Sequence, residues 1–358
     1  MKKFLKVAAL LVAVLMLASV FAVGCAKKQE ETEPAAQEAK KEEPKKEESK
    51  QDDVKYPTKP IQVVVPAGAG GDTDLNARTL GKYLEKELGQ PVVIVNVNGA
   101  GGTLGSKKVK DSAPDGYTVL FYHPSMLLNK LLGLVDYTYS DFENAGVAVL
   151  DDTNVFVVNA ESPYKNLKDL IDDAKKNPGK IRFATEVGAF THLQVLAFQD
   201  AADVQLNVVD VGAAAQKTAA LLGKQIDIIG TQYGLVKDHI TAGKFRALGV
   251  LSNERNPLIP DVPTFKEQGI DIAFTKFFFY SFPKGTPKEV IEKFSKAVEK
   301  VVTTNEEYKA DAKKFLVTPT YMAPVDAMKY IKEKEDYYNT FKDKIMDVKN
   351  SEKKEEKK

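Results

Sequence analysis

Short apolar runs alternate with amphipathic stretches along most of the chain. Seven short segments are predicted strands, and one of them, the continuous apolar run Ile61–Val65, has the composition of a strand covered on both faces. The seven segments are Ile61–Val65, Val92–Asn96, Thr118–Tyr122, Arg182–Thr185, Leu206–Asp210, Ile226–Gly230 and Arg246–Val250. Between them, apolar residues recur at helical spacing, as in Asp74–Leu88, which Gly89 ends, and in Asn166–Asn177. This alternation predicts an α/β fold of mostly parallel sheets flanked by helices.

The last third of the chain departs from this rhythm. Ile272–Phe282 is a long aromatic run with strand composition, whereas Pro287–Thr304 and Pro324–Asp343 have helical periodicity. We expect the chain to cross from a first domain to a second near Asp151–Val158 and to return through the aromatic run. Within that run, Phe277–Tyr280 suit either a buried core or a wall that faces a ligand.

These crossings divide the folded part into two predicted domains. The first is discontinuous and comprises residues 55–153 and 275–348, and the second comprises residues 154–274. A connection made of two strands is a natural hinge for closure of the domains around a ligand. Residues 349–358 form a charged tail.

The N-terminal segment has the pattern of a bacterial lipoprotein signal peptide. Lysines precede an apolar run, Val7–Val23, which leads through a glycine to Cys25. We therefore expect residues 1–24 to be a signal peptide, and a lipid on Cys25 to anchor an extracytoplasmic protein to the bacterial cell membrane. The alternative is a transmembrane anchor, because the run approaches the ~20 residues that span a bilayer. Residues 25–54 have too few large apolar side chains to form a core and predict a disordered tether.

Composition argues against several classes of function. The chain has 51 Lys and Arg against 50 Asp and Glu, with no basic stripe carrying interleaved aromatic residues, so we expect no nucleic-acid binding. Its three histidines lie far apart and no HExxH or paired-cysteine spacing occurs, so neither a metal nor another cofactor is expected. Ser125, His192 and Asp210 are the residue types of a catalytic triad, but no G-x-S-x-G elbow accompanies them. We expect a binding protein and not an enzyme.

Two glycine-rich turns carry the strongest sign of a binding site. Each joins a predicted strand to a predicted helix, as IQVVVPAGAGGDTD at 61–74 and as IRFATEVGAFTH at 181–192. Neither GAGGDTD in the first turn nor NGAGGTLG at 98–105 matches G-x-G-x-x-G or the P-loop of nucleotide-binding proteins. Backbone N–H groups at a helix N-terminus are unpaired and bear a partial positive charge, which favours an anion. The pattern therefore predicts a cleft that grips a small anion from two sides.

A succession of segments resembles one known family. These segments are YPTKPIQVVVP, GGDTD, LGQPVVIVN, GAGGTLG, APDGYT, NPGKIRF, THL, LLGKQIDI, ITAGKFRALGV, PDVPTFKEQG and KGTPKEVIEK. Over about Tyr56–Phe341 the chain resembles the extracytoplasmic solute receptors of tripartite tricarboxylate transporters, the Bug-type receptors. The resemblance implies a two-lobed periplasmic-binding-protein fold, type II-like, joined by a two-strand hinge. It also implies a receptor without catalysis or cofactor, which captures a small organic anion, usually a carboxylate, and delivers it to membrane permease subunits.

The resemblance places ligand contacts on three loops. The residues it implies are Ala67, Gly68, Ala69, Gly70, Gly71, Asp72, Thr73, Asp74, Thr185, Glu186, Val187, Gly188, Ala189, Phe190, Thr191, His192, Val211, Gly212, Ala213 and Ala214. His123 and Ser125 follow a strand end at the same crevice, and Tyr233, after another strand, is the best candidate for an aromatic wall.

Several of these residues have a purely structural alternative. Thr73, Asp74 and Thr191 suit helix caps, and His192 suits a packed position inside a helix. The glycine-rich segment at 98–102 suits either a lining of the cleft or a tight turn.

Departures from the family's pattern bear on the ligand. Asp72 and Glu186 stand where relatives often have glycine, and Val211-Gly212-Ala213 replaces a common Tyr-Lys-Gly, which removes a basic side chain. A buried carboxylate beside a carboxylate ligand is costly unless it is paired or neutralised. Either both acids point to solvent and backbone amides hold a simple carboxylate, or one acid pairs with the cationic group of an amino acid or another zwitterion.

Two further expectations concern partners. Nothing in the sequence suggests an obligate partner surface, so we expect a monomer. The alternative to transport is a ligand sensor that presents its closed form to a signalling partner.

Overall fold

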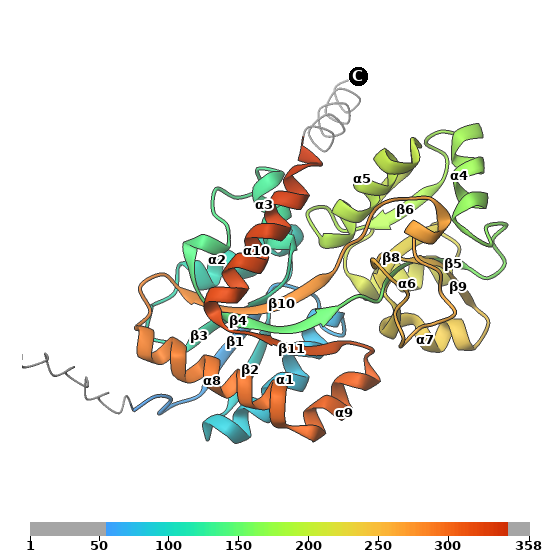
Figure 1. The fold of residues 1–358 in the computed structure, drawn as a ribbon. Coiled ribbons are helices and arrows are strands. Elements are labelled where there is room, and N and C mark those ends of the chain that lie inside the picture. The colour runs from blue at the N-terminus through green and yellow to red at the C-terminus, as the bar shows by residue number, and fades with distance from the viewer. Residues whose placement is uncertain (1–54, 343–358) are drawn as a thin grey trace, which may run out of the picture. The chain divides into compact units, whose positions relative to one another are not determined.

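The computed structural model describes residues 55–342, which form two sheets flanked by helices (Figure 1). The predicted signal peptide, Cys25, the tether at 25–54 and the charged tail at 349–358 lie outside the described residues. Within 55–342 no helix combines the length and the apolar character needed to cross a membrane.

The first sheet has six strands in the order β11-β4-β10-β3-β1-β2. Its strands are β1 (Ile61–Val65), β2 (Val92–Asn96), β3 (Thr118–Tyr122), β4 (Phe142–Asp151), β10 (Lys276–Pro283) and β11 (Thr318–Met322). Helices cover both of its faces, since α1 and α8 share one apolar cluster with it while α2, α3 and α10 share another. These helices are α1 (Asp72–Leu88), α2 (Thr103–Lys110), α3 (Ser125–Leu131), α8 (Lys288–Thr304), α9 (Glu306–Lys314) and α10 (Pro324–Asn339).

The second sheet has five strands in the order β7-β6-β8-β5-β9. Its strands are β5 (Asn154–Asn159), β6 (Arg182–Thr185), β7 (Asn207–Asp210), β8 (Ile228–Gln232) and β9 (Phe245–Val250). Helices α4 and α5 pack in one apolar cluster with it, and α6 and α7 pack in another. They are α4 (Leu167–Lys176), α5 (Phe190–Ala202), α6 (Ala214–Leu222) and α7 (Tyr233–Thr241), and the short 3-10 turns are η1 (Ala100–Gly102), η2 (Tyr139–Asp141) and η3 (Lys266–Gln268).

Both sheets are mixed, which corrects the expectation of mostly parallel sheets. Strands β1, β2 and β3 pair in parallel, as do β6, β7 and β8, but β10 is antiparallel to β3 and β4. Likewise β5 is antiparallel to β8 and β9. Strands β10 and β5 therefore run opposite to the βα strands of their sheets, whereas β4, which pairs antiparallel with β10, runs in the same direction as β3.

The aromatic run in β10 belongs to the core. Phe277, Phe278, Phe279 and Tyr280 are each at most 1% exposed. Side chains alternate across the strand, so Phe277 and Phe279 join one apolar cluster while Phe278 and Tyr280 join the other. Each fully buried phenylalanine stabilises the fold by about 1.5–3 kcal/mol. The run therefore fastens helices to both faces of the first sheet.

The two crossings between the sheets lie side by side. The chain leaves the first sheet between Asp151 and Asn154 and returns to it at Lys276, which pairs in register with Asp151 (Figure 1). The buried Asp151 carboxylate accepts hydrogen bonds from Thr153 N (2.8 Å), Thr153 Oγ1 (2.6 Å) and Asn154 Nδ2 (3.0 Å). The predicted domain boundaries stay a prediction, and these hydrogen bonds fix the first crossing locally.

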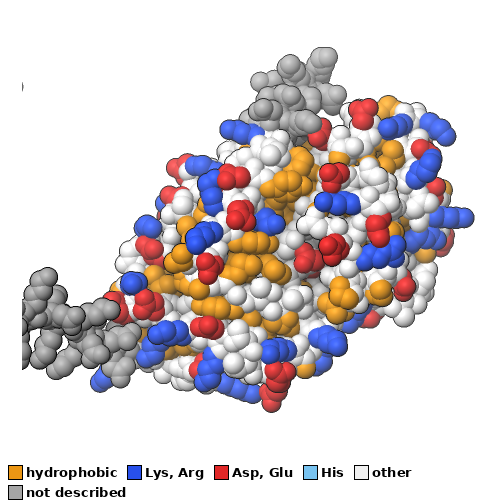
Figure 2. Space-filling model, in the orientation of Figure 1, with side chains coloured by type: hydrophobic (Ala, Val, Ile, Leu, Met, Phe, Trp, Pro, Cys, Tyr) orange, Lys and Arg blue, Asp and Glu red, His pale blue; other side chains and the backbone are white. Residues whose placement is uncertain are grey.

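Charged side chains are distributed over the surface without segregation by sign. On the face shown in Figure 2, lysines and arginines are intermixed with aspartates and glutamates. This matches the near balance of basic and acidic residues in the sequence.

The Asp151 carboxyl predicts a pH-dependent stability. Burial raises its pKa to about 7, against the effect of the Thr153 hydrogen bonds, and the neighbouring Asp72 raises it further. The folded protein therefore holds this proton more tightly than the unfolded chain does, and the resulting stability is lost as pH rises from about 4 to about 7. Urea unfolding of the wild type and Asp151→Asn should show their free energies of unfolding diverge in that range, by up to about 4 kcal/mol in favour of the variant.

Asp261→Asn, at an exposed position, is the matched control and should keep the wild-type pH profile. Parallel profiles for the wild type and Asp151→Asn would contradict the prediction.

Candidate functional site

A cavity of about 80 Å³ lies between the loops of the two sheets. The first, second and third predicted loops all line it, together with residues from β3, β5, β8, α7 and β10 or next to them. The lining residues are Ala67, Gly68, Gly71, Asp72, Thr73, His123, Asn154, Glu186, Ala189, Phe190, Thr191, Gly212, Ala213, Ala214, Lys217, Thr231, Gln232, Leu235 and Lys276.

The structure brings part of the predicted site together at this cavity. The predicted residues that line it are Ala67, Gly68, Gly71, Asp72, Thr73, Glu186, Ala189, Phe190, Thr191, Gly212, Ala213 and Ala214, and His123 lines it as well. The predicted residues that do not line it are Ala69, Gly70, Asp74, Ser125, Thr185, Val187, Gly188, His192, Val211 and Tyr233. Direct contact with a ligand stays a prediction for the first group.

Several residues of the second group have structural partners instead. Asp74 accepts a hydrogen bond from the Gly70 N–H (2.9 Å) and pairs with Arg78 (2.9 Å). His192 Nδ1 accepts a hydrogen bond from the Gly188 N–H (3.3 Å), and burial lowers its pKa to about 4, so it is a neutral packed histidine. Tyr233 begins α7 and packs against an apolar cluster of the second sheet. The aromatic side chain at the cavity is Phe190.

Three helices begin at the cavity without a side-chain cap. The residues before α1, α5 and α6 are Gly71, Ala189 and Ala213, and none of them makes a capping hydrogen bond through a side chain. Each helix start therefore presents backbone N–H groups and the positive end of its dipole. Because the three starts belong to two different sheets and line one cavity, their fields add there and favour an anion.

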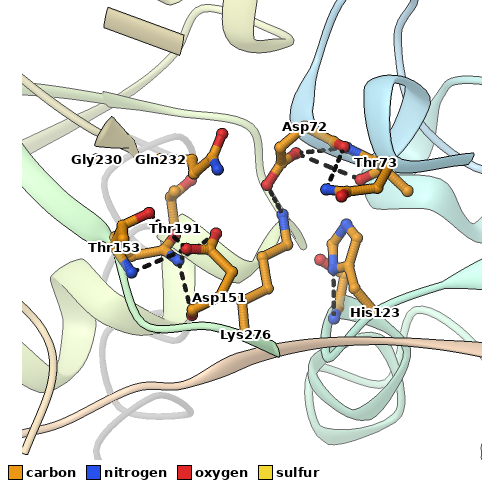
Figure 3. Close-up of polar contacts among 12 residues, drawn as sticks. Asp72, Thr73, His123, Asp151, Thr153, Thr191, Gly230, Gln232 and Lys276 are labelled. Carbon is orange, nitrogen blue, oxygen red and sulfur yellow. Dashed lines mark hydrogen bonds and ion pairs between the residues drawn. The ribbon is translucent and has the colours of Figure 1, made fainter. Parts of the chain in front are cut away.

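Asp72 is neutralised by a lysine that the sequence reasoning missed. Lys276, the first residue of β10, places its Nζ 2.5 Å from an Asp72 carboxylate oxygen, and Figure 3 shows the two side chains reaching toward each other. Although burial alone would raise the pKa of Asp72, the Lys276 charge and the Thr73 N–H bring this pKa below its usual value. Asp72 is thus ionised and paired, which differs from both alternatives drawn from the sequence.

His123 lies beside this ion pair and is uncharged. Its Nδ1 accepts a hydrogen bond from the Ser125 N–H (3.3 Å). Burial, together with the Lys276 charge, holds the pKa of His123 well below its usual value. At neutral pH it therefore contributes a polar wall and no charge.

A second lysine, Lys217 of α6, supplies a cation that the third loop lacks. Its Nζ donates to the Gly230 carbonyl (3.0 Å) and, at longer range, to Thr191 Oγ1 (3.4 Å). Burial lowers its pKa to about 8, and the Lys276 charge acts in the same direction. The third loop itself lacks the basic side chain of the common Tyr-Lys-Gly, and Lys217, one helical turn beyond the loop, brings an ammonium to the cavity instead.

Glu186 remains at the cavity as predicted, in a half-buried position. Burial raises the pKa of Glu186, while the Lys217 charge and the Gly101 N–H act against this effect. Nearby, Asp210 accepts hydrogen bonds from the N–H groups of Val187 and Gly212, which joins the second loop to the third.

Close backbone approaches join the two sides of the cavity. A Cβ added to Gly101 would lie 2.7 Å from the Val187 carbonyl oxygen and 2.9 Å from Gly188 Cα. On another edge, Gln232 Nε2 donates to the Phe315 carbonyl (2.6 Å). The structure therefore holds the two sides in contact, and at Gly101 only glycine fits, because its φ of +63° is also unfavourable for other residues.

A two-lobed α/β fold with a charged cavity between its lobes defines the class of periplasmic-binding-protein receptors. The family model described as "Tripartite tricarboxylate transporter family receptor" matches residues 76–345, and the chain belongs to this family of extracytoplasmic solute receptors. This confirms the family indicated by the sequence, and the class of fold with it.

Individual relatives agree with this assignment. Protein BugT of Bordetella pertussis is 35% identical over 241 residues, which cover 66% of this chain and 74% of that protein. The solved structure of the periplasmic binding protein BugD is 31% identical, with a TM-score of 0.74 over 81% of this chain and 98% of that chain. MatC from Rhodopseudomonas palustris with bound malate shares the fold, at 24% identity and a TM-score of 0.75 over 80% of this chain and 100% of that chain.

The buried Asp72–Lys276 pair predicts a strong thermodynamic coupling. The side chains are 15% and 8% exposed, so removing one partner leaves an uncompensated buried charge. Asp72→Asn should lower the free energy of unfolding by about 3–5 kcal/mol. The double variant Asp72→Asn with Lys276→Met should lose clearly less free energy of unfolding than the sum of the losses in the two single variants.

A double-mutant cycle by urea unfolding measures this coupling. The exposed pair Lys168–Asp172 is the control and should show a much smaller coupling. If the losses of stability at Asp72 and Lys276 simply add, the two side chains do not stabilise each other and the prediction is contradicted.

The close contact at Gly101 predicts that a side chain at this position stops the two sides of the cavity from approaching each other. Gly101→Ala should prevent the approach of the two sides and weaken ligand binding by at least tenfold. Gly133→Ala is the matched control, because Gly133 has a similar φ of +65° but an added Cβ there meets nothing within 4 Å. Small-angle scattering with saturating ligand should show compaction for Gly133→Ala and none for Gly101→Ala, and equal compaction of both would refute the role of this contact.

Proposed function

We propose that this protein captures a small organic carboxylate in the cavity between its lobes and delivers it to the membrane permease of a tripartite tricarboxylate-type transporter. The observation that carries the proposal is the convergence of three uncapped helix N-termini and the Lys217 ammonium on one cavity. Backbone N–H groups and a buried ammonium are donors that suit a carboxylate, and such charge-assisted hydrogen bonds are the strong ones.

Binding is coupled to closure of the lobes. The first loop belongs to the lobe of the first sheet, and the second and third loops belong to the other lobe, so one ligand contacts both. A ligand that contacts both lobes favours the closed arrangement by its differential affinity for it. The permease then distinguishes the loaded receptor from the empty one by the relative position of the lobes.

Anchoring completes the proposed role. A lipid on Cys25 and the tether at 25–54 would keep the receptor close to its membrane partner while the folded part turns freely. The relatives support an extracytoplasmic receptor, and the lipid rests on the sequence pattern alone.

Calorimetric titration of the intact chain tests the capture of a carboxylate. The probes include malate and adipate, which fold neighbours carry, and small monocarboxylates and amino acids, each beside its uncharged amide analogue. At least one carboxylate should bind with a micromolar or lower Kd. Its amide should bind at least 100-fold more weakly, because the charge-assisted hydrogen bonds are lost.

The same titration followed by small-angle scattering should show compaction only with probes that bind. If no carboxylate binds, or if amides bind as tightly as acids, the proposed function is wrong.

A further inference from the structure

Two charged side chains at the cavity have no ion-pair partner among residues 55–342. Lys217 and Glu186 both line the cavity, and neither forms an ion pair in this part of the chain. The other two charges there, Asp72 and Lys276, neutralise each other at 2.5 Å. The cavity therefore holds one cation and one acid that act on each other's charge without forming a direct ion pair.

The structure keeps these two groups apart. The Lys217 ammonium is tied to the Gly230 carbonyl of β8 and to Thr191 Oγ1 of α5. Glu186 belongs to the second loop, where its carbonyl accepts a hydrogen bond from the Ala189 N–H (2.9 Å) and its carboxylate faces the Gly101 N–H of the other lobe. Opposite charges that share a small cavity without meeting are arranged for a ligand that meets both.

We propose that the cavity selects a zwitterion, with Lys217 pairing with its carboxylate and Glu186 with its cationic nitrogen, as a small α-amino acid would provide. This inference rests on the proposed function and specifies its ligand class. A zwitterion compensates both charges at once and leaves the cavity neutral. A cavity of about 80 Å³ fits a ligand with few heavy atoms.

Charge balance sets the order of preference. A simple monocarboxylate would pair with Lys217 but leave Glu186 uncompensated beside a new negative charge. A dicarboxylate would add a second negative charge next to Glu186 and close to Asp72. Placing like charges in a desolvated site is costly unless one of them takes up a proton. Neutral amino acids should therefore bind best, monocarboxylates of the same skeleton more weakly, and dicarboxylates most weakly.

The test uses matched ligands and the intact chain. Calorimetry compares neutral amino acids such as glycine, alanine and serine with two analogues of each, the acid without the amino group and the amide without the carboxylate. The amino acid that binds should have an affinity at least about 100-fold higher than either of its analogues, because each analogue leaves one buried charge of the cavity without a partner.

Two variants test which side chain pairs with which charge of the ligand. Lys217→Met should weaken binding of the amino acid by at least about 100-fold. Glu186→Gln should weaken binding of the amino acid by about tenfold or more and should strengthen binding of the corresponding monocarboxylate. A merely structural role of Glu186 would not give this crossover. Lys180→Met and Glu254→Gln, at exposed positions, should leave every affinity unchanged.

Thermal unfolding without ligand checks that the variants fold. Lys217→Met should be at least as stable as the wild type, because it replaces an unpaired buried ammonium with an apolar side chain of similar volume. If Lys217→Met fails to fold, Glu186→Gln with its ligand crossover still decides the inference.

The outcomes separate this inference from the proposed function. If monocarboxylates or dicarboxylates bind as tightly as amino acids, or if Glu186→Gln leaves amino-acid affinity unchanged, the zwitterion inference is overturned while carboxylate capture stands. If no acid of any kind binds, the proposed function itself fails.

Discussion

Compensation of buried charge is the constraint on which the rest of this structure depends. Two ammonium groups, of Lys217 and Lys276, are buried at one small cavity, where the Lys276 charge disfavours the charged form of Lys217. Lys276 is tolerated because Asp72 reaches it from the first loop. That ion pair also joins the first loop to the strand by which the chain returns from the second lobe. The geometry of the site and the path of the chain are thus fixed by the same contact.

The convergence of helix starts favours an anion at the cavity although its side-chain charges balance. Side chains can pair with each other, and at α1 the Thr73 N–H donates to the Asp72 carboxylate, but the starts of α5 and α6 have no side-chain cap. Small residues before each helix let the backbone approach the cavity closely. The loops therefore supply the preference for an anion, and the lysines and acids around them determine which anion fits.

The sequence predicted the local parts of this arrangement well. The strand–turn–helix pattern around Gly71 and Ala189 is encoded by neighbouring residues, so the first two loops could be placed at the cavity. Lys276 could not be found in this way, because only the register of β10 against β4 brings it to the cavity. Lys217 gave a weak local signal, since it lies four residues after Ala213, where a helix returns to the face on which it began.

The direction of strands was the main error in the fold. Parallel pairing follows from local βα units, whereas β5 and β10, which border the crossings between the lobes, run opposite to the βα strands of their sheets. The polar helix α9 and the proline-containing strand β11 carry little hydrophobic periodicity and were not predicted. Tyr233 was misplaced because β8 ends at Gln232, two residues later than expected, which makes Tyr233 the first residue of α7.

The position of Asp151 at the crossing has a thermodynamic consequence for ligand capture. Its carboxyl is half-titrated near neutrality, and it senses the charges of Asp72 and Lys276, which line the cavity. Under the proposed function, a ligand that brings a net negative charge into that cavity would make ionisation of Asp151 less favourable and would draw a proton from the medium, whereas a net-neutral zwitterion would have a smaller effect. By reciprocity, acidification would strengthen retention of the anionic ligand by the same factor. Proton uptake at the crossing would thus report the net charge that the ligand carries.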